Sequence, residues 1–241
     1  MTNIKPAATA QVIRELPQGG IEVLMLRRNR AVKFASGFWV YPGGKIEPEE
    51  MAGVTDLQAA KTAAVREAKE EANLNLKDVD LHFFVHWTTP TTQPKRFGTF
   101  FYHTQVPYEG TKITVDNSEI VEHRWMTPQV AMDAALSKEI LLMPPTYISL
   151  QRIRYCMNYS EVTAEWKRSN PLYILPVVHM VGSQAVSMYE GDAGYESGDC
   201  ELEGPRHRLL FDYKKASFEF QYSDCDHHFP VNGLRHLHKS D

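Results

Sequence analysis

The residues best suited to chemistry in this chain are three glutamates, Glu67, Glu70 and Glu71. Their i, i+3 and i+4 spacing brings them to one face of a helix, because an α-helix completes a turn in about 3.6 residues. Like charges held so closely destabilise a helix. A divalent cation would neutralise them, and hard carboxylate oxygens suit Mg²⁺ or Mn²⁺. The spacing therefore predicts a metal site on this helix.

Local signals delimit the helix that must carry these glutamates. Thr55 followed by Gln58 has the pattern of a capping box, so we expect the helix to begin near Thr55, with the Gln58 side chain reaching back. Asn73 accepts the left-handed conformation used at helix ends, and the helix is expected to stop there. The apolar stripe expected to face the core comprises Leu57, Val65, Ala68 and Ala72.

Strands are predicted on both sides of the helix. Upstream, two runs form a hairpin and a third short strand leads into Pro42-Gly43-Gly44; these strands cover residues 8–13, 21–26 and 38–41. Downstream, three runs rich in β-branched and aromatic residues cover 81–87, 96–106 and 119–126. Proline-initiated helices are expected after Thr127 and from Pro144, the second with Tyr147, Leu150, Ile153 and Met157 on its core face. Beyond Trp166, short apolar segments predict a β-rich C-terminal part, with Pro176 at an edge or bulge.

Composition limits the range of functions. The chain has 241 residues, of which 43% are hydrophobic, and a net charge of -4. This acidic balance offers no basic surface for nucleic acid, and we expect neither a signal peptide nor a membrane span. Three cysteines at unpatterned spacings indicate a reducing compartment, so a cytoplasmic location is expected. A homodimer remains open.

The glutamates belong to a longer set of residues that resembles the Nudix box, G-x5-E-x7-R-E-U-x-E-E-x-G-U. The set comprises Gly44, Glu50, Arg66, Glu67, Glu70 and Glu71. Fifteen residues rather than seven separate Glu50 from Arg66, so the box carries an eight-residue insertion, and Asn73 replaces the closing glycine. The resemblance implies an α+β Nudix fold, with a mixed β-sheet between helices, that hydrolyses a diphosphate joined to another group. The change in character after Trp166 predicts a Nudix hydrolase domain over 1–168 and a β-rich extension over 169–241.

The resemblance also implies roles for individual residues. It assigns Mg²⁺ or Mn²⁺ to the Gly44 carbonyl and to the carboxylates of Glu67, Glu70 and Glu71. Arg66 would orient a glutamate through a charge-assisted hydrogen bond, which gives Arg66 and Glu67 a part in catalysis. Glu50 is a more distant candidate.

The general base of this family often lies outside the box. Glu119 and Glu122 are placed to supply it, and the alternative interpretation is a solvated strand end before Trp125.

The segment before the box is basic and resembles the one found in coenzyme A diphosphatases, L-L-T-x-R-[SA]-x3-R-x3-G-x3-F-P-G-G. Arg28 keeps its place, Lys33 stands for the second arginine and Tyr41 for phenylalanine. Arg28 and Lys33 are expected to meet phosphates, although lysine lacks the bidentate fork of arginine. Gly43, with no Cβ, would let the backbone approach a phosphate.

The insertion and the segments 141–146 and 191–195 are similar to the acyl-coenzyme A diphosphatase branch of the same family. This resemblance implies coenzyme A or an acyl-coenzyme A as substrate, cleaved to adenosine 3′,5′-bisphosphate and a 4′-phosphopantetheine. ADP-ribose or another nucleoside diphosphate derivative is the alternative substrate. A non-catalytic, nucleotide-sensing Nudix module is the alternative class, although such modules typically lose box glutamates that this chain retains. A basic run later in the chain has two interpretations. It either binds a 3′-phosphate or consists of ordinary side chains on a strand; its residues are Arg206, His207 and Arg208.

Overall fold

Strand β1 (Ile4–Glu15) is central to the first sheet and is buried along most of its length. A continuous buried run is typical of a strand covered on both faces. The C-terminal end of β1 pairs with β2 (Ile21–Arg28), whereas its N-terminal half pairs with β4 (Gly43–Lys45) on the same edge. The sheet thus divides along β1, and the glycine pair lies at the division.

This computed structural model describes residues 4–169, 171–212, 214 and 217–225.

The other strands complete a mixed sheet in the order β3-β2-β1-β6-β5-β8, with β7 beside β2. β6 runs parallel to β1, and β8 runs parallel to β5. The strands are β3 (Trp39–Val40), β5 (His82–Thr88), β6 (Arg96–Gln105), β7 (Ile120–Met126) and β8 (Leu172–Ile174). The upstream hairpin and the strands predicted downstream of the box helix are therefore confirmed.

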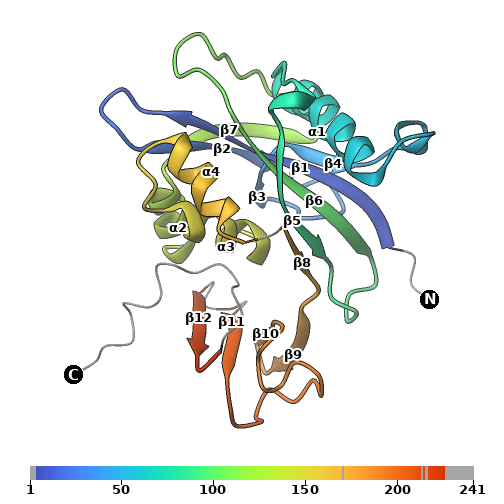
Figure 1. The fold of residues 1–241 in the computed structure, drawn as a ribbon, viewed down its shortest axis with the longest axis vertical. Helices are drawn as coiled ribbons and strands as arrows, with labels where there is room; N and C mark the ends of the chain where they lie inside the picture. Colours follow the sequence, from blue (N-terminus) through green and yellow to red (C-terminus); the bar gives the residue numbers. More distant parts are fainter. Residues whose placement is uncertain (1–3, 170, 213, 215–216, 226–241) are drawn as a thin grey trace.

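Helix α1 (Asp56–Ala72) covers one face of this sheet (Figure 1). Thr55 accepts the Gln58 backbone N–H at its N-cap, and Asn73 ends the helix in the left-handed conformation, so both predicted limits are confirmed. The Gln58 side chain does not reach back, because it donates to Asp78 at 3.2 Å. Two short 3-10 helices flank α1 in sequence, η1 (Pro48–Met51) and η2 (Asp78–Asp80).

The buried face of α1 differs from the predicted one. Leu57, expected in the core, is 40% exposed, and Val65 is only partly buried. The face that packs on the sheet consists almost wholly of alanines, namely Ala59, Ala60, Ala63, Ala64, Ala68 and Ala72. Methyl side chains let a helix axis approach a sheet closely. This short distance determines how far the other α1 side chains are buried.

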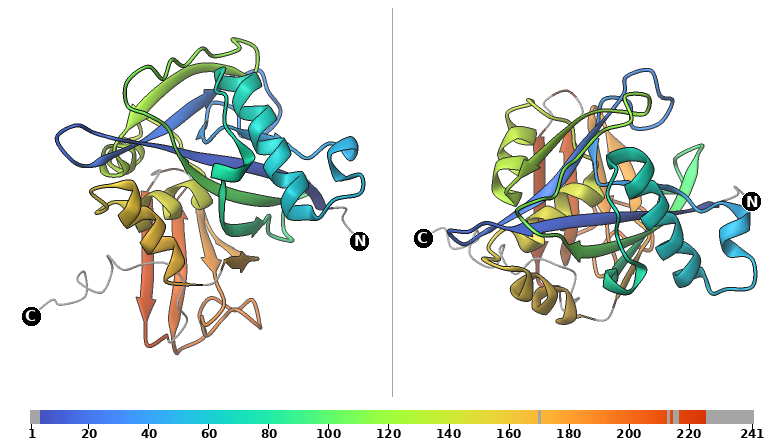
Figure 2. Two further views of the ribbon diagram at one scale, coloured as in Figure 1. Left: turned by 45° about the horizontal axis from the view of Figure 1, so that its top comes forward. Right: turned by 90° about the horizontal axis from the view of Figure 1, so that it is seen from above.

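The opposite face of the sheet is covered by α2 (Pro128–Leu136), α3 (Pro144–Ile153) and α4 (Tyr159–Lys167) (Figures 1 and 2). Thr127 caps α2 as predicted, by accepting the Val130 N–H. Met157, expected on the core face of α3, lies beyond its end and is 55% exposed. α4 has no counterpart among the predicted helices. In the described part of the chain, none of the helices has the length and apolar character that a bilayer span requires.

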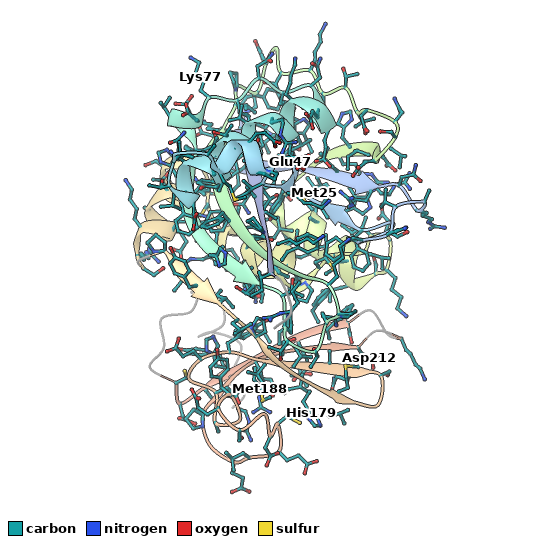
Figure 3. All side chains as sticks on the ribbon, turned by 90° about the vertical axis from the view of Figure 1, so that its right-hand side faces the viewer. Met25, Glu47, Lys77, His179, Met188 and Asp212 are labelled. Atoms are coloured by element: carbon teal, nitrogen blue, oxygen red, sulfur yellow. The ribbon has the colours of Figure 1, made fainter. Side chains whose placement is uncertain are left out.

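The C-terminal part forms a second, antiparallel sheet, seen at the bottom of Figures 1 and 3. Its strands are β9 (Val177–Val181), β10 (Gln184–Met188), β11 (Arg206–Asp212) and β12 (Ser217–Ser223). Pro176 lies between β8 and the edge strand β9, where it interrupts no ladder. The second sheet packs on the first unit through Phe218, whose ring stacks on Tyr147 with centroids 4.1 Å apart.

Asn73 at the end of α1 is expected to contribute to the stability of the protein. Its φ of 54° is tolerated by asparagine and glycine but disfavoured for other residues. We expect Asn73→Ala to lower the free energy of unfolding by about 1 kcal/mol, whereas Asn73→Gly, the matched control, leaves it nearly unchanged. Urea unfolding followed by circular dichroism measures both. Equal midpoints for Asn73→Ala and the unmodified protein would contradict this assignment.

Candidate active site

Helix α1 presents its three glutamates at different depths. The Glu71 side chain is 6% exposed and that of Glu67 is 15% exposed, whereas that of Glu70 is 58% exposed. Because the alanine face seats α1 against the sheet, Glu71 is drawn inward with that face and Glu70 is left at the rim. Three glutamates that look equivalent in the sequence therefore differ in burial, from the enclosed Glu71 to the solvated Glu70.

Gly43 and Gly44 are required because other atoms lie directly against their backbone, those of strand β1 at Gly43 and the Glu67 carboxylate at Gly44. A Cβ at Gly44 would collide with the Glu67 carboxylate, and one at Gly43 would collide with β1 at the Ala8 carbonyl. The Gly43 N–H donates to Glu71 Oε2 at 2.9 Å. The backbone of Gly43 was predicted to approach a phosphate. In the structure its N–H contacts a carboxylate of the chain itself, that of Glu71.

Arg66 connects the acidic residues of the box. Its Nη1 donates to Glu67 Oε1 at 2.8 Å and to Glu70 Oε2 at 3.0 Å. Its Nε and Nη2 donate to the two oxygens of Glu50 at 2.9 and 3.3 Å, and Nη2 also reaches the Lys45 carbonyl at 2.9 Å. These interactions raise the pKa of Arg66, with the Glu50 hydrogen bond as the largest cause. Glu50 is therefore an ion-pair partner of Arg66, and Arg66 is placed to orient Glu67.

Arg28 enters the cluster from the end of β2. Its Nη1 lies 3.5 Å from Glu71 Oε1, and its Nη2 lies 3.1 Å from Glu119 Oε2. Glu119 is close enough to the box that its charge contributes to raising the pKa of both Glu67 and Glu71. The structure thus brings Arg28 and Glu119, which lie 91 positions apart in the chain, to the buried end of the cluster at Glu71.

Asp116 is a site residue that the sequence analysis missed. Its carboxylate accepts the backbone N–H groups of Glu119 at 2.9 Å and of Ile120 at 2.8 Å, and it also pairs with the Ser118 hydroxyl. An aspartate that caps the next few backbone amides is a turn signature, and the run Asp-Asn-Ser-Glu carries it. Asp116 thereby fixes the turn that presents Glu119.

Glu122, the other predicted base, is not brought to the cluster. Its carboxylate pairs with Arg27 at 2.7 Å and with Arg124 at 2.9 Å. The Arg124 guanidinium lies over Trp39, which belongs to the core on the side of α2 and α3. Arg27 and Arg28 are adjacent in β2 and point to opposite faces of the sheet, so only Arg28 reaches the α1 side.

Other candidate substrate contacts lie in different places. Lys33 is exposed in the loop between β2 and β3. Arg208 is buried and forms an ion pair with Asp192, while Arg206 donates to the carbonyls of Leu202 and Gly204. The open question about Arg206 and Arg208 is therefore answered in favour of a structural role in the second sheet.

Burial dominates the electrostatics of the cluster. It raises the pKa of Glu71 from an ordinary 4.5 to about 8, helped by the charge of Glu67 and opposed by the Gly43 N–H and by Arg28. Burial also raises the pKa of Glu67, against the hydrogen bond from Arg66. Because both carboxyl groups resist ionisation, the cluster lacks enough positive charge nearby to balance them.

The donor set fits a hard divalent cation. Carboxylate oxygens from three glutamates and the adjacent Gly44 carbonyl are the ligand types that Mg²⁺ and Mn²⁺ prefer. Across residues 4–225 as described, no three acidic, histidine or cysteine side chains already converge in metal-ligand geometry. In the box, the Arg66 Nη1 donates to both Glu67 and Glu70. Metal binding would therefore require these carboxylates to turn from the arginine toward the ion.

Comparison with known proteins agrees with this geometry. Residues 5–143 match the NUDIX domain family. The chain is 26% identical over 211 residues to nudix hydrolase 7 of Caenorhabditis elegans, covering 72% of this chain and 69% of that protein. It is 26% identical over 171 residues to the acyl-coenzyme A diphosphatase NUDT19 of Homo sapiens, covering 66% of this chain but only 42% of the human protein. A crystal structure of a NUDIX hydrolase from Alicyclobacillus acidocaldarius has a similar fold, with a TM-score of 0.60 at 24% identity over 68% of this chain and 97% of that one.

The raised pKa of Glu71 predicts a pH-dependent stability. Below pH 4.5 the carboxyl is protonated in both the folded and the unfolded chain, and its burial carries no charge penalty. As the pH rises toward about 8, only the unfolded chain releases the proton, so the folded state loses stability. With EDTA present, we expect the unfolding midpoint of the unmodified protein to fall from pH 5 to pH 9 more steeply than that of Glu71→Gln. Excess Mg²⁺ should reduce the difference, and parallel profiles in EDTA would contradict the assignment.

Proposed function

Because the chain belongs to the Nudix hydrolase family, we propose that it hydrolyses the diphosphate linkage of coenzyme A or an acyl-coenzyme A. The products would be adenosine 3′,5′-bisphosphate and 4′-phosphopantetheine or its acyl ester. As a Nudix diphosphatase, it acts on nucleotide-type small molecules, and the family typically uses a divalent metal. The observation that carries the proposal is the placement of Arg28, a phosphate-binding side chain type, directly between Glu71 and Glu119.

In this proposal Glu67, Glu70, Glu71 and the Gly44 carbonyl hold Mg²⁺ or Mn²⁺. When bound, such an ion supplies charge that offsets the diphosphate oxygens and lowers the pKa of a water molecule. The arginines divide the remaining work. Arg66 orients Glu67 through a hydrogen bond to its carboxylate. Arg28 exchanges its contact with Glu119 or Glu71 for one with a phosphate oxygen.

Glu119 is the proposed general base. Its side chain is 61% exposed, so water has access to it, and the Asp116 turn holds it beside the cluster. When a phosphate takes up Arg28, the Glu119 carboxylate is free to accept a proton from the attacking water.

The choice of coenzyme A over other nucleotides has two further supports. One is the similarity to the human protein whose name states acyl-coenzyme A diphosphatase activity. The other is a cavity of about 310 Å³ that is lined mainly by apolar side chains, including two from the segment between the glycine pair and α1. Ile46 and Met51 line it, and they directly follow Lys45 and Glu50, the residues that accept from Arg66. An apolar cavity so close to the box suits a substrate that carries an acyl chain.

The substrate is tested with a panel of diphosphates in Mg²⁺ or Mn²⁺. We expect kcat/KM for coenzyme A and its acyl esters to exceed that for ADP-ribose, NADH and nucleoside triphosphates by at least about tenfold, about 1.4 kcal/mol in transition-state binding. Chromatography should show adenosine 3′,5′-bisphosphate as the product, and EDTA should abolish its release. Faster cleavage of ADP-ribose would replace the proposed substrate. Calorimetric binding of a nucleotide without turnover would instead indicate a sensing module.

Glu119 and Glu122 form a matched pair for the general base. We expect Glu119→Gln to lower kcat by about a hundredfold, the scale typical of a positioned base. Glu122→Gln should leave kcat nearly unchanged, because its carboxylate pairs with Arg27 and Arg124 on the other face of the sheet. Steady-state kinetics with metal present measure both, and equal losses in the two variants would rule out the assignment.

A further inference from the structure

Two phenylalanines and a lysine gather where the loop between β2 and β3 meets the start of β6. Phe34 lies in the loop between β2 and β3 and is 40% exposed, and Phe97 is the second residue of β6. Their ring centroids are 5.0 Å apart at an angle of 52°. The Lys95 ammonium lies 5.9 Å from the centroid of Phe34 and 5.5 Å from that of Phe97. An aromatic surface with a cation beside it is chemically matched to a base that carries a phosphate nearby.

One arginine connects this surface to the carboxylates. Arg28 Nε donates to the Phe34 carbonyl at 3.2 Å, while its two terminal nitrogens face Glu71 and Glu119. The backbone of Phe34 thus contacts the arginine at which the diphosphate is proposed to bind. In a nucleotide, a single ribose separates the base from the 5′-phosphate. A base resting on the pair would therefore leave its diphosphate at Arg28.

The hairpin that carries Phe97 and Lys95 is held at its base. Phe97 donates its N–H to the Thr89 hydroxyl at 3.0 Å, and the Thr89 N–H donates to the Phe97 carbonyl at 2.9 Å. The buried Arg96 donates to the Thr89 carbonyl at 2.9 Å. Phe97 and Lys95 therefore start from a fixed strand end, and a ligand would meet a surface that is already formed.

The charge at Lys95 bears on which nucleotide is bound. Coenzyme A carries a phosphate on the ribose 3′ position that ADP-ribose lacks. Arg206 and Arg208, which the sequence offered for that phosphate, are engaged within the second sheet. Lys95 instead lies beside the aromatic pair, where a base-linked ribose would bring its 3′-phosphate, and a lysine can pair with a phosphate as a point charge.

We propose that Phe34 and Phe97 form the stacking platform for the adenine of the substrate and that Lys95 pairs with its ribose 3′-phosphate. The inference rests on the proposed function and adds to it a structural reason for preferring coenzyme A to nucleotides without a 3′-phosphate.

The test compares coenzyme A with 3′-dephospho-coenzyme A, which differs only in that phosphate. Lys95→Met keeps the aliphatic stem and removes the charge. We expect it to lower kcat/KM for coenzyme A about tenfold, the scale of a lost phosphate contact, mainly through KM, and to leave that for the dephospho form within about twofold. Phe34→Ala should lower kcat/KM for both substrates by about tenfold or more, because base stacking does not depend on the 3′-phosphate. Lys77→Met, at an exposed lysine of the turn before η2, is the control and should change neither value.

Each alternative result has a defined meaning. Equal effects of Lys95→Met on the two substrates, or no effect on either, would overturn the role of Lys95, and unchanged kinetics in Phe34→Ala would overturn the platform. If the unmodified protein cleaves neither compound, the proposed function fails. The inference is then judged by calorimetry with adenosine 3′,5′-bisphosphate and adenosine 5′-monophosphate. Tighter binding of the bisphosphate that Lys95→Met removes would support it, and equal binding would reject it.

Discussion

The structure around the box depends on burying a carboxylate next to other carboxylates. Glu71 is almost fully enclosed, beside Glu67, and burial alone would favour its protonated form. The chain opposes this with a backbone N–H from Gly43 and a guanidinium from Arg28. Neither removes the deficit of positive charge, because the pKa of Glu71 stays raised. The proposed metal ion would supply the positive charge that this cluster lacks.

The division of β1 between two partners makes this burial possible. Where β1 leaves β2 it pairs with β4, so the glycine pair runs directly beneath α1. The alanine face of α1 lets the helix lie close to the sheet, and the missing side chain at Gly44 makes room for the Glu67 carboxylate. Arg28, at the end of β2, and Glu119, immediately before β7, meet at the same place. Four separate parts of the sequence thereby contribute to one site.

The C-terminal part is joined to the family domain rather than attached by a tether. Strand β8 pairs with β5 in the first sheet, and the second sheet shares a core with α3 through the stacked rings of Tyr147 and Phe218. Within it, the buried pair of Arg208 and Asp192 is further held by the backbone N–H groups of His207 and Gly194. A buried ion pair with such complete hydrogen bonding favours one arrangement of its surroundings, and here it holds the turn before β11.

The sequence by itself determined the local features and the identity of the chemistry. Thr55 and Asn73 delimit α1 correctly because caps depend on a few neighbouring residues, and the spacing of the box residues identifies the carboxylate helix because helical periodicity is local. Only the tertiary structure decided which side chains face the site. Leu57 is exposed because the alanines, not the larger residues, contact the sheet. Glu119 and Glu122 look alike in the sequence. In the structure, the Glu122 carboxylate pairs with Arg27 and Arg124, whereas the turn at Asp116 presents Glu119 to Arg28, which also pairs with Glu71.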